Sequence, residues 1–387
     1  MARALASNAL TLLIPLLLAL AGILAWGQAQ YRGPGPLAQA ICVEVAPGST
    51  MSQVSRQLAE QGAISNPTLF RLGADYTERS GLLKAGSFMV EPGASMEEIV
   101  AAITESGRST CGTEVNFRIG VTTAEVLVRE LDPATQTFEE VVRFTPADEE
   151  PPAAYLAELE QPGTRFRVTL AEGVTSWQVV ESLRALDLLS GGVEEIPAEG
   201  SLAPDSYEVR PGDDKAALIA EMQARQERIL SDLWAARQDG LPLESPEEAL
   251  ILASIVEKET AQPEERPLVA SVFVNRLRDG MRLQTDPTVI YGVTEGRGTL
   301  GRGLRQSELR AATPWNTYVI EGLPPTPIAN PGRESIAATL NPVESDYIFF
   351  VADGTGGHAF AVTLAEHNEN VARWRVIEAE RREAAGE

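Results

Sequence analysis

The feature that most constrains this chain is a single apolar run close to its N-terminus. Residues 4–30 carry no charged side chain, and the most apolar part covers residues 10–26. A helix that crosses a bilayer needs about 20 such residues, so this run just suffices. Trp26 and Tyr31 stand where aromatic side chains flank a membrane. The sequence therefore predicts one membrane-spanning helix followed by a large water-exposed part.

The charges around the run predict its orientation. Arg3 and the amino terminus precede it, which keeps the N-terminus in the cytoplasm and exports the rest of the chain. A cleaved signal peptide is the alternative, although the small-x-small string at residues 38–40 lies far beyond the apolar part. We favour a retained anchor over residues 1–30. In either case, the bulk of the chain is expected outside the cytoplasm.

The composition limits the class of partner. The 387 residues include 55 Asp and Glu against 32 Lys and Arg, which gives a net charge of −23. Such a surface repels polyphosphate, so nucleic acid is not an expected partner. The same acidity also serves solubility in general, so it does not by itself indicate a function.

Two cysteines, Cys42 and Cys111, lie in the part of the chain that is expected to be exported. An oxidising compartment allows a disulfide between them. Two unpaired, buried thiols are the alternative, and the sequence does not decide between the two.

An internal repeat follows a short Gly- and Pro-rich linker. Residues 45–58 and 170–183 share Gly, Thr, Gln, Val and Leu at a constant offset, as expected for a strand, a glycine turn and a Thr-capped helix. Residues 83–93 and 202–212 then alternate like short strands and end in a Pro-Gly turn before another helix. Chance likeness is the alternative. We interpret the repeat as two small α+β modules of related design, at residues 41–107 and 166–243.

Residues 108–165 separate the two modules. Residues 113–121 alternate like a strand, residues 138–144 are a second candidate strand, and residues 148–152 have the composition of a loop. We interpret this stretch as an insertion packed on the first module. From residue 244 to residue 387 the pattern changes to long helices and Pro- and Gly-rich loops. The expected fold class is thus α+β, with a mixed α/β domain at the C-terminus.

The helix that opens this last domain is delimited by its own sequence. Ser245 and Pro246 form a helix start, and Glu248 stands where it completes a capping box. Pro263 then stops the helix. The string Glu257-Lys258-Glu259 therefore falls in its last turn.

The two acids of that turn have different neighbours. Glu259 follows the apolar residues at positions 256, 255 and 252 at helical spacing, whereas Glu257 lies above Ala253 and Ser254. Because desolvation disfavours charge, Glu259 is expected to hold its proton more tightly than a free glutamate. A general acid that breaks a glycosidic bond needs that property. Two ordinary helix-end acids are the alternative.

The segments after this helix add polar candidates. A second helix is expected from about residue 264 to residue 278. Residues 281–292 alternate as an extended segment that places Gln284 and Asp286 on one side. Both side chains suit contacts to sugar hydroxyls, since carboxylates and amides hydrogen-bond to them.

Later loops carry the remaining candidates. Asn316 and Tyr318 lie in stiff Pro-rich loops, and a structural role in a turn is the alternative to sugar binding. His358 follows a Gly-Gly pair after an apolar strand at residues 347–352. His358 and His367 are the two histidines of the chain and lack the spacing of a zinc site. Neither a metal nor another cofactor is therefore expected.

At these residues the sequence resembles the endolytic murein transglycosylase family, also called YceG-like. The resemblance covers residues 247–374 closely, and the membrane helix and first module match in layout. Two features depart from the family pattern. One is the stretch after Gly107, and the other is Trp315, at a position where the family more often has Tyr. The matching strings are LASIVEKET at 252–260, VNRL at 274–277, MRLQTDPTVIYG at 281–292, NTY at 316–318, GLPP at 322–325, NPG at 330–332, GH at 357–358 and HN at 367–368.

The resemblance implies an inner-membrane enzyme that acts in the periplasm and cleaves nascent peptidoglycan within the glycan strand. It implies a LysM-like first module, a catalytic domain at residues 244–387, and 1,6-anhydro products made with one glutamate as acid and base. The family's catalytic glutamate maps onto Glu259, in agreement with the helical spacing. Expected partners are glycan strands, the inner membrane, and peptidoglycan synthases or other elongation and division proteins. The expected substrate contacts are Gln284, Asp286, Asn316, Tyr318 and His358.

Two other functions stay open. Asp286 could serve as a second carboxylate, which would make the enzyme a hydrolytic muramidase. A glycan-binding scaffold of the cell-wall machinery, with an inactive last domain, is a different class. Loss of Glu259 would be the usual mark of such a scaffold, and Glu259 is present.

Overall fold

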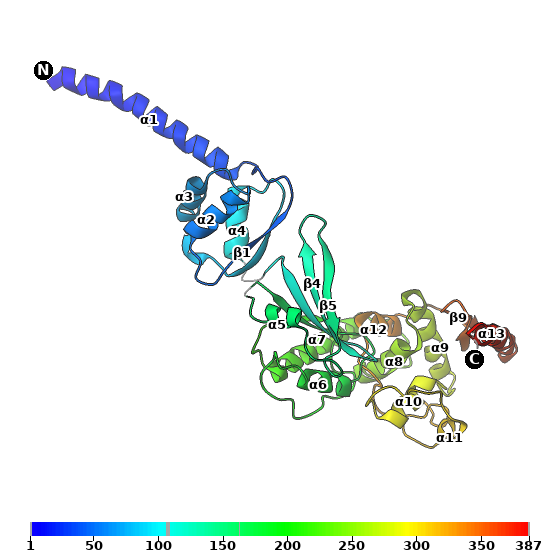
Figure 1. Ribbon diagram of the computed structural model, residues 1–387. Coiled ribbons are helices and arrows are strands. Elements are labelled where there is room, and N and C mark those ends of the chain that lie inside the picture. The colour runs from blue at the N-terminus through cyan, green and yellow to red at the C-terminus, as the bar shows by residue number, and fades with distance from the viewer. Residues whose placement is uncertain (1, 106–108, 162, 386–387) are drawn as a thin grey trace. The chain divides into compact units, whose positions relative to one another are not determined.

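The computed structural model describes residues 2–105, 109–161 and 163–385, with side chains from residue 14 to residue 383 within these ranges. The chain divides into two compact units, which are described separately with the labels of Figure 1. Unit 1 comprises Met1–Asn116, Leu127–Phe144 and Pro151–Phe166, and unit 2 comprises Phe117–Val126, Thr145–Glu150 and Arg167–Glu387.

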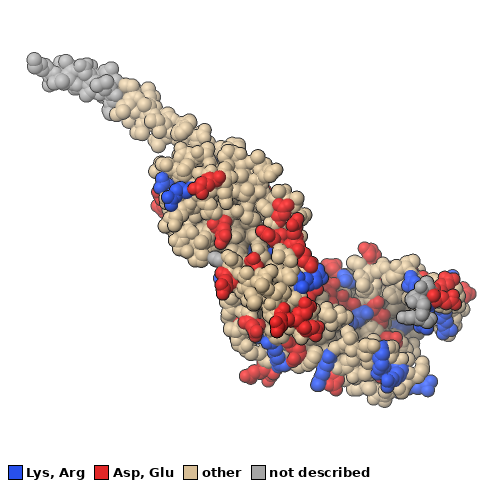
Figure 2. Space-filling view, in the orientation of Figure 1, with Lys and Arg blue, Asp and Glu red and all other residues tan. Residues whose placement is uncertain are grey.

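The N-terminal helix α1 (Ala2–Arg32) contains the predicted apolar run. Within the described residues, its segment Ile14–Arg32 is the one helix that is long and apolar enough to cross a membrane. The side chains of residues 14–26 are exposed, with Trp26 at 58%, and Figure 2 shows this part of the helix without charged residues. The predicted candidate span is therefore present, while the side chain of Arg3 lies outside the described residues.

Tyr31 does not lie at the surface, as an aromatic side chain that flanks a membrane would. Its side chain is 7% exposed and belongs to the apolar core of the first module. A Cβ atom at Gly73 would lie 2.0 Å from a ring carbon of Tyr31, so only glycine fits there. The end of α1 is thus packed into unit 1.

The first module has a small core between a two-stranded sheet and helices. Strands β1 (Ile41–Val45) and β2 (Gly86–Val90) pair antiparallel, with Val43 opposite Phe88. Phe70 and Phe88 are fully buried at the centre of the core. The helices are α2 (Met51–Glu60), α3 (Pro67–Tyr76), the short η1 (Ser80–Leu82) and α4 (Met96–Glu105).

The local signals of the predicted repeat are confirmed in both copies. Thr50 caps α2 and Thr175 caps α6 (Ser176–Arg184), and each accepts a hydrogen bond from the backbone of a glutamine three residues later. The side chains of Gln53 and Gln178 accept a bond back from the cap, which completes both capping boxes. The glycine two residues before each cap has a φ of 79° or 78°, a conformation that favours glycine.

A five-stranded sheet has the strand order β5-β4-β3-β6-β7. The predicted strands at 113–121 and 138–144 correspond to β3 and β5. Strand β4 is not visible as an alternation, because residues 126–128 are all buried in succession. The described residues between 109 and 165 contribute to both units, and their interpretation as an insertion stays a prediction. The strands and the following helix are β3 (Thr113–Ile119), β4 (Ala124–Asp132), β5 (Thr137–Phe144), α5 (Ala153–Glu158), β6 (Arg165–Leu170) and β7 (Ser206–Val209).

The C-terminal part of unit 2 is mainly helical. Leu252 and Ile255 of α8 and Phe273 of α9 are fully buried in its core. Both helices lie where the sequence predicts them. The elements are α7 (Lys215–Ala235), α8 (Pro246–Glu259), η2 (Pro263–Glu265), α9 (Arg266–Arg278), α10 (Asp286–Thr294), α11 (Gln306–Leu309), α12 (Arg333–Leu340), the antiparallel pair β8 (Phe349–Ala352) and β9 (His358–Ala361), and α13 (Leu364–Ala385).

The extended segment that was predicted for residues 281–292 is wrong beyond residue 285. Asp286 begins the helix α10, and Pro287 occupies its first turn, where a missing N–H leaves no hydrogen bond unmade. Gln284 lies just before the helix with a φ of 50°. The two side chains therefore do not share one side of a strand.

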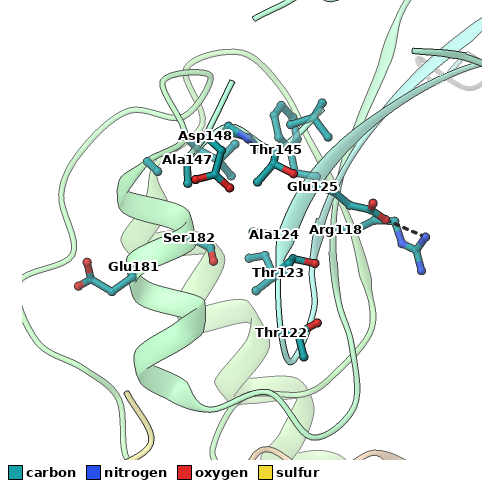
Figure 3. Close-up of a pocket in the computed structure, with 16 residues that line it drawn as sticks. Arg118, Thr122, Thr123, Ala124, Glu125, Thr145, Ala147, Asp148, Glu181 and Ser182 are labelled. Atoms are coloured by element: carbon teal, nitrogen blue, oxygen red, sulfur yellow. Dashed lines mark hydrogen bonds and ion pairs between the residues drawn. The ribbon is translucent and has the colours of Figure 1, made fainter. Parts of the chain in front are cut away.

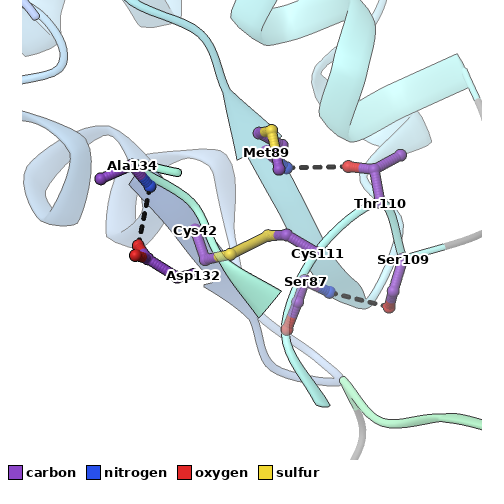
Figure 4. Close-up of a disulfide and its surroundings, with 8 residues drawn as sticks. All are labelled: Cys42, Ser87, Met89, Ser109, Thr110, Cys111, Asp132 and Ala134. Carbon is purple, nitrogen blue, oxygen red and sulfur yellow. Dashed lines mark hydrogen bonds between the residues drawn. A yellow bond between two sulfur atoms is a disulfide. The ribbon is translucent and has the colours of Figure 1, made fainter. Parts of the chain in front are cut away.

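Cys42 and Cys111 form a disulfide, which settles the alternative that the sequence left open. Their Cα atoms are 5.9 Å apart. The residues before Cys111 are fastened along β2, because Ser109 Oγ accepts a hydrogen bond from Ser87 N at 2.9 Å and Thr110 Oγ1 accepts one from Met89 N at 2.8 Å (Figure 4). The disulfide thus ties β1 to the segment that leads into β3.

Replacing Cys111 with Ala is expected to lower the stability of the protein by roughly 2–3 kcal/mol, because the disulfide closes a long loop and restricts the unfolded chain. The measurement is thermal unfolding of the two proteins with and without a thiol reductant. The reductant should bring the melting temperature of the unmodified protein down to that of the variant. Equal melting temperatures under oxidising conditions would contradict the prediction.

Candidate active site

Glu259 is the last residue of α8, and its carboxylate lies against the start of α10. The hydroxyl of Thr285 donates a hydrogen bond to Glu259 Oε1. Thr285 is itself held in place, since its backbone N–H donates to Thr317 Oγ1 at 3.1 Å. Thr317 Oγ1 in turn lies 2.8 Å from Thr288 Oγ1 in a buried position. A fixed threonine network therefore positions the glutamate.

Burial raises the pKa of Glu259 above its ordinary value. The hydrogen bond from Thr285 and the charges of His358 and Arg276 act in the opposite direction, and the carboxylate of Asp286 adds to the rise. Burial is the largest of these effects. The protonated form is therefore favoured, as the apolar neighbours in the sequence predict.

Glu257 and Lys258, which precede Glu259 on α8, make contacts that hold the fold together. Glu257 Oε2 accepts a hydrogen bond from Gly332 N at 2.9 Å, and Glu257 Oε1 lies 3.8 Å from the guanidinium of Arg266. Arg266 also pairs with Glu172 at 3.0 Å. Lys258 Nζ donates to the carbonyl oxygen of Gly173 at 3.2 Å. Glu257 and Lys258 thus connect α8 to the turn between β6 and α6 and to the start of α12.

Asp286 and Tyr318 form a pair beside the glutamate. The Tyr318 hydroxyl donates to Asp286 Oδ1 at 2.7 Å. Burial and the Asp286 carboxylate raise the pKa of Tyr318, so the phenol stays a hydrogen-bond donor. Arg276 adds a buried positive charge nearby, and its side chain donates to the carbonyl oxygens of Ile348 and Leu283. The structure therefore brings Glu259, Asp286 and Tyr318 together.

His358 lies at the start of β9 and is held by Glu265, a residue that the sequence did not single out. Glu265 Oε2 lies 2.7 Å from His358 Nδ1, and Glu265 Oε1 accepts the backbone N–H of His358 at 2.8 Å. A Cβ atom at Gly357 would lie 2.5 Å from Glu265 Oε1, so the close approach requires glycine. The edge of the imidazole contacts Phe350 at 5.2 Å between ring centroids. No local pattern reveals this pairing, because the two residues are far apart in sequence.

Gln284 and Asn316 differ in their access to a ligand. Gln284 is exposed, and its positive φ is strained for a residue other than glycine, as is common next to functional sites. Asn316 is fully buried, and its side-chain amide donates to three backbone carbonyls between residues 308 and 311. Its Oδ1 accepts the backbone N–H of Tyr318 at 3.0 Å. Asn316 therefore shapes the loop that presents Tyr318, as in the alternative of a structural role, and its contact with substrate stays a prediction.

Comparison with known proteins gives a consistent result. The sequence profile of the YceG-like family matches residues 43–145 and 142–373. The chain is 26% identical over 327 residues to the endolytic murein transglycosylase of Bacillus subtilis (strain 168), which covers 84% of this chain and 82% of that protein. It is 27% identical over 340 residues to a protein of the same name from Streptococcus pneumoniae serotype 2 (strain D39 / NCTC 7466), which covers 86% of this chain and 58% of that protein.

A crystal structure of a yceG-like protein from Listeria monocytogenes is 26% identical in sequence, with a TM-score of 0.45, and the match covers 86% of this chain and 98% of that one. The streptococcal relative is longer, since this chain spans 58% of its length. The family profile covers most of the residues between the N-terminal helix and the C-terminal end of the fold. This chain belongs to the YceG-like family.

Proposed function

We propose that this protein is an endolytic peptidoglycan transglycosylase. It would cleave the bond between N-acetylmuramic acid and N-acetylglucosamine within nascent glycan strands and leave 1,6-anhydro ends. The observation that carries the proposal is Glu259, a carboxyl group whose pKa is raised by burial and which lies beside the pair of Asp286 and Tyr318. Family membership and the name of the Bacillus relative support the same activity.

In the proposed mechanism, one carboxyl group acts twice. Glu259 first protonates the bridging glycosidic oxygen as the bond from that oxygen to C1 of N-acetylmuramic acid breaks. The resulting carboxylate then accepts the proton of the C6 hydroxyl while O6 bonds to C1. The proton that Glu259 gave is thereby returned, no water is consumed, and neither a second acid nor a cofactor is needed.

The neighbours of Glu259 suit this double role. Thr285 holds the carboxyl group in one orientation, and the charges of His358 and Arg276 stabilise the carboxylate that exists between the two steps. Asp286 and Tyr318 lie beside the reacting bond in this proposal and bind sugar hydroxyls. The exposed side chain of Gln284 is proposed as a further sugar contact.

The products distinguish the proposal from its two rivals. Digestion of purified glycan strands followed by mass spectrometry should give anhydro ends, which are lighter than reducing ends by one water. Reducing ends that disappear in an Asp286→Asn variant would instead indicate a muramidase that uses Asp286 as second carboxylate. Intact strands that remain bound to the protein would indicate a scaffold.

Location and partners are part of the same proposal. The apolar helix α1 would anchor the chain in the inner membrane, with the remaining residues in the periplasm. The disulfide between Cys42 and Cys111 supports an oxidising compartment. The first module, proposed to be LysM-like, would hold glycan, and peptidoglycan synthases or other elongation and division proteins would be neighbours there. Protease protection of residues 41–387 in intact cells, lost when the outer layers are opened, tests the orientation.

Replacing Glu265 with Gln is expected to lower kcat by about 10-fold with little change in KM. Glutamine keeps an acceptor for the backbone of His358 but loses the charge that aligns the imidazole, and a misplaced catalytic neighbour costs about one to two orders of magnitude. Kinetics on glycan strands measure the effect. The matched control is Glu264→Gln, a change at the exposed residue next to it. Equal kcat values for the two variants would show that the Glu265 pairing is structural.

A further inference from the structure

A hollow of about 320 Å³ in unit 2 lies next to Glu259 and has no part in the proposed chemistry. Lys258 and Pro287 line it, and they are the chain neighbours of Glu259 and Asp286. The opposite wall is formed by Thr175 and Gln178 at the start of α6. Two of its lining residues are thus directly bonded to residues of the candidate site, and its other lining residues extend to α6.

A second hollow of about 310 Å³ lies farther along α6. Figure 3 shows Ser182 of α6 facing Thr123 and Ala124 across it, with Thr145 and Ala147 at one end. All its lining residues belong to unit 2. The hollow is therefore built within one compact unit, between α6 and the turn that joins β3 to β4.

The two hollows follow one another along one face of α6. Positions 175 and 178 line the first, and positions 181, 182, 185 and 186 line the second. Within α6, steps of three and four residues place positions 178, 181 and 182 on the same side of the helix, and Thr175, Ala185 and Leu186 flank its two ends. The β3–β4 turn borders both hollows, since Val121 lines the first and Thr122 the second. At this border Gln178 Nε2 donates to the carbonyl oxygen of Val121 at 2.7 Å, and the two hollows on either side are here called together the α6 groove.

The chemistry of the α6 groove favours a neutral ligand with many hydroxyls. Threonine and serine hydroxyls alternate with apolar side chains along its walls. Glu125, Asp148 and Glu181 line the second hollow, and its one basic residue, Arg118, is paired with Glu125 at 3.2 Å. The second hollow therefore repels anionic ligands, whereas Lys258 and Arg302 line the first hollow with no carboxylate among its lining residues, so the groove as a whole favours a neutral ligand. Sugar rings present apolar faces and hydroxyl edges, and each hollow reaches the roughly 300 Å³ of a small ligand site.

We propose that the α6 groove binds the sugar backbone of the glycan strand on one side of the bond that is cleaved. This inference rests on the proposed function. The groove would select strands that extend well past the reacting sugars, so cleavage occurs inside a strand. The acidic side chains of the second hollow would turn the peptide stems, with their carboxylates, outward.

A bulky side chain in the groove tests the inference. Ala185→Trp places an indole in the second hollow, and Ala224→Trp puts the same change on an exposed position of α7 that lines neither hollow. On long strands, Ala185→Trp should lower kcat/KM by about 10-fold, which corresponds to about 1.4 kcal/mol of lost binding. On short oligosaccharides that do not extend past the residues around Glu259, it should leave kcat/KM unchanged. Thr123→Trp, on the opposite wall, serves as a second variant should Ala185→Trp not fold.

Binding in an inactive background separates this inference from the proposed function. In a Glu259→Gln protein, the affinity for long strands should fall about 10-fold with Ala185→Trp and stay constant with Ala224→Trp. Equal affinities of the two variants for long strands would overturn the proposal that the α6 groove binds glycan. Absence of anhydro products from the unmodified protein would overturn the proposed chemistry, and the binding comparison would still decide whether the groove holds glycan.

Discussion

Glu259→Gln is expected to lower kcat on glycan strands by about 1000-fold or more, because the same carboxyl group serves as acid and as base and each role contributes about 100-fold or more. Glutamine has nearly the same shape and keeps an oxygen for the hydrogen bond from Thr285, so the fold should be retained. The measurement is the rate at which anhydro ends appear. Glu247→Gln is a matched control, since Glu247 is an exposed glutamate in the first turn of the same helix. A Glu259→Gln protein with full activity would remove the basis of the proposal.

The same variant should be at least as stable as the unmodified protein. Because burial raises the pKa of Glu259, the folded state favours the protonated carboxyl group. That contribution is complete below the pKa of a free glutamate and is lost as pH rises through the raised pKa. The neutral amide avoids this loss, so the melting temperature of Glu259→Gln should exceed that of the unmodified protein increasingly as pH rises. A difference in melting temperature that stays constant across pH would contradict the raised pKa of Glu259.

Arg266→Met is expected to destabilise the protein by about 3–5 kcal/mol at neutral pH, which is typical when one partner of a buried ion pair is removed. The guanidinium lies 3.0 Å from Glu172 and 3.8 Å from Glu257, and the side chain of Glu257 is 6% exposed. Without it, two carboxylates face each other and one of them stays buried. Urea unfolding measures the loss. Arg278→Met, at the exposed end of the same helix, is the matched control.

The loss of stability caused by Arg266→Met should become smaller as pH falls. Burial and the charge of Glu257 raise the pKa of Glu172, and Arg266 lowers it. Removing the arginine therefore raises that pKa further, and a carboxyl group with a raised pKa loses stability as pH rises through it. At low pH Glu172 is protonated, which removes the repulsion between its carboxylate and that of Glu257. Adding Glu257→Gln to the variant should restore part of the stability at neutral pH, and a deficit that is independent of pH would exclude the electrostatic cause.

Much of the fold follows from local sequence signals. The capping boxes at Thr50 and Thr175 and the helix start at Ser245 depend on residues within one turn, so the sequence shows them directly. The segment at Asp286 shows the limit of such signals. Alternating polarity suggested an extended chain, whereas a proline in the first turn and the capping position of Thr285 make it a helix.

The candidate site is predicted only where helical spacing decides the geometry. Glu259 could be separated from Glu257 because both lie on one helix. Glu265 could not be assigned, because its partner His358 lies on another segment and only the fold brings the two together. The partners of Asn316 lie within its own loop, but no regular spacing marks them. An amide that caps a loop and an amide that binds a sugar have the same sequence appearance. Burial, which only the structure gives, distinguishes them.

The packing of Tyr31 determines what kind of tether α1 can be. Its ring is held against Gly73 inside the core of the first module, so the helix enters that module directly. If α1 spans the inner membrane as proposed, the first module is held at the membrane surface, and the glycan that it is proposed to bind is glycan close to the membrane.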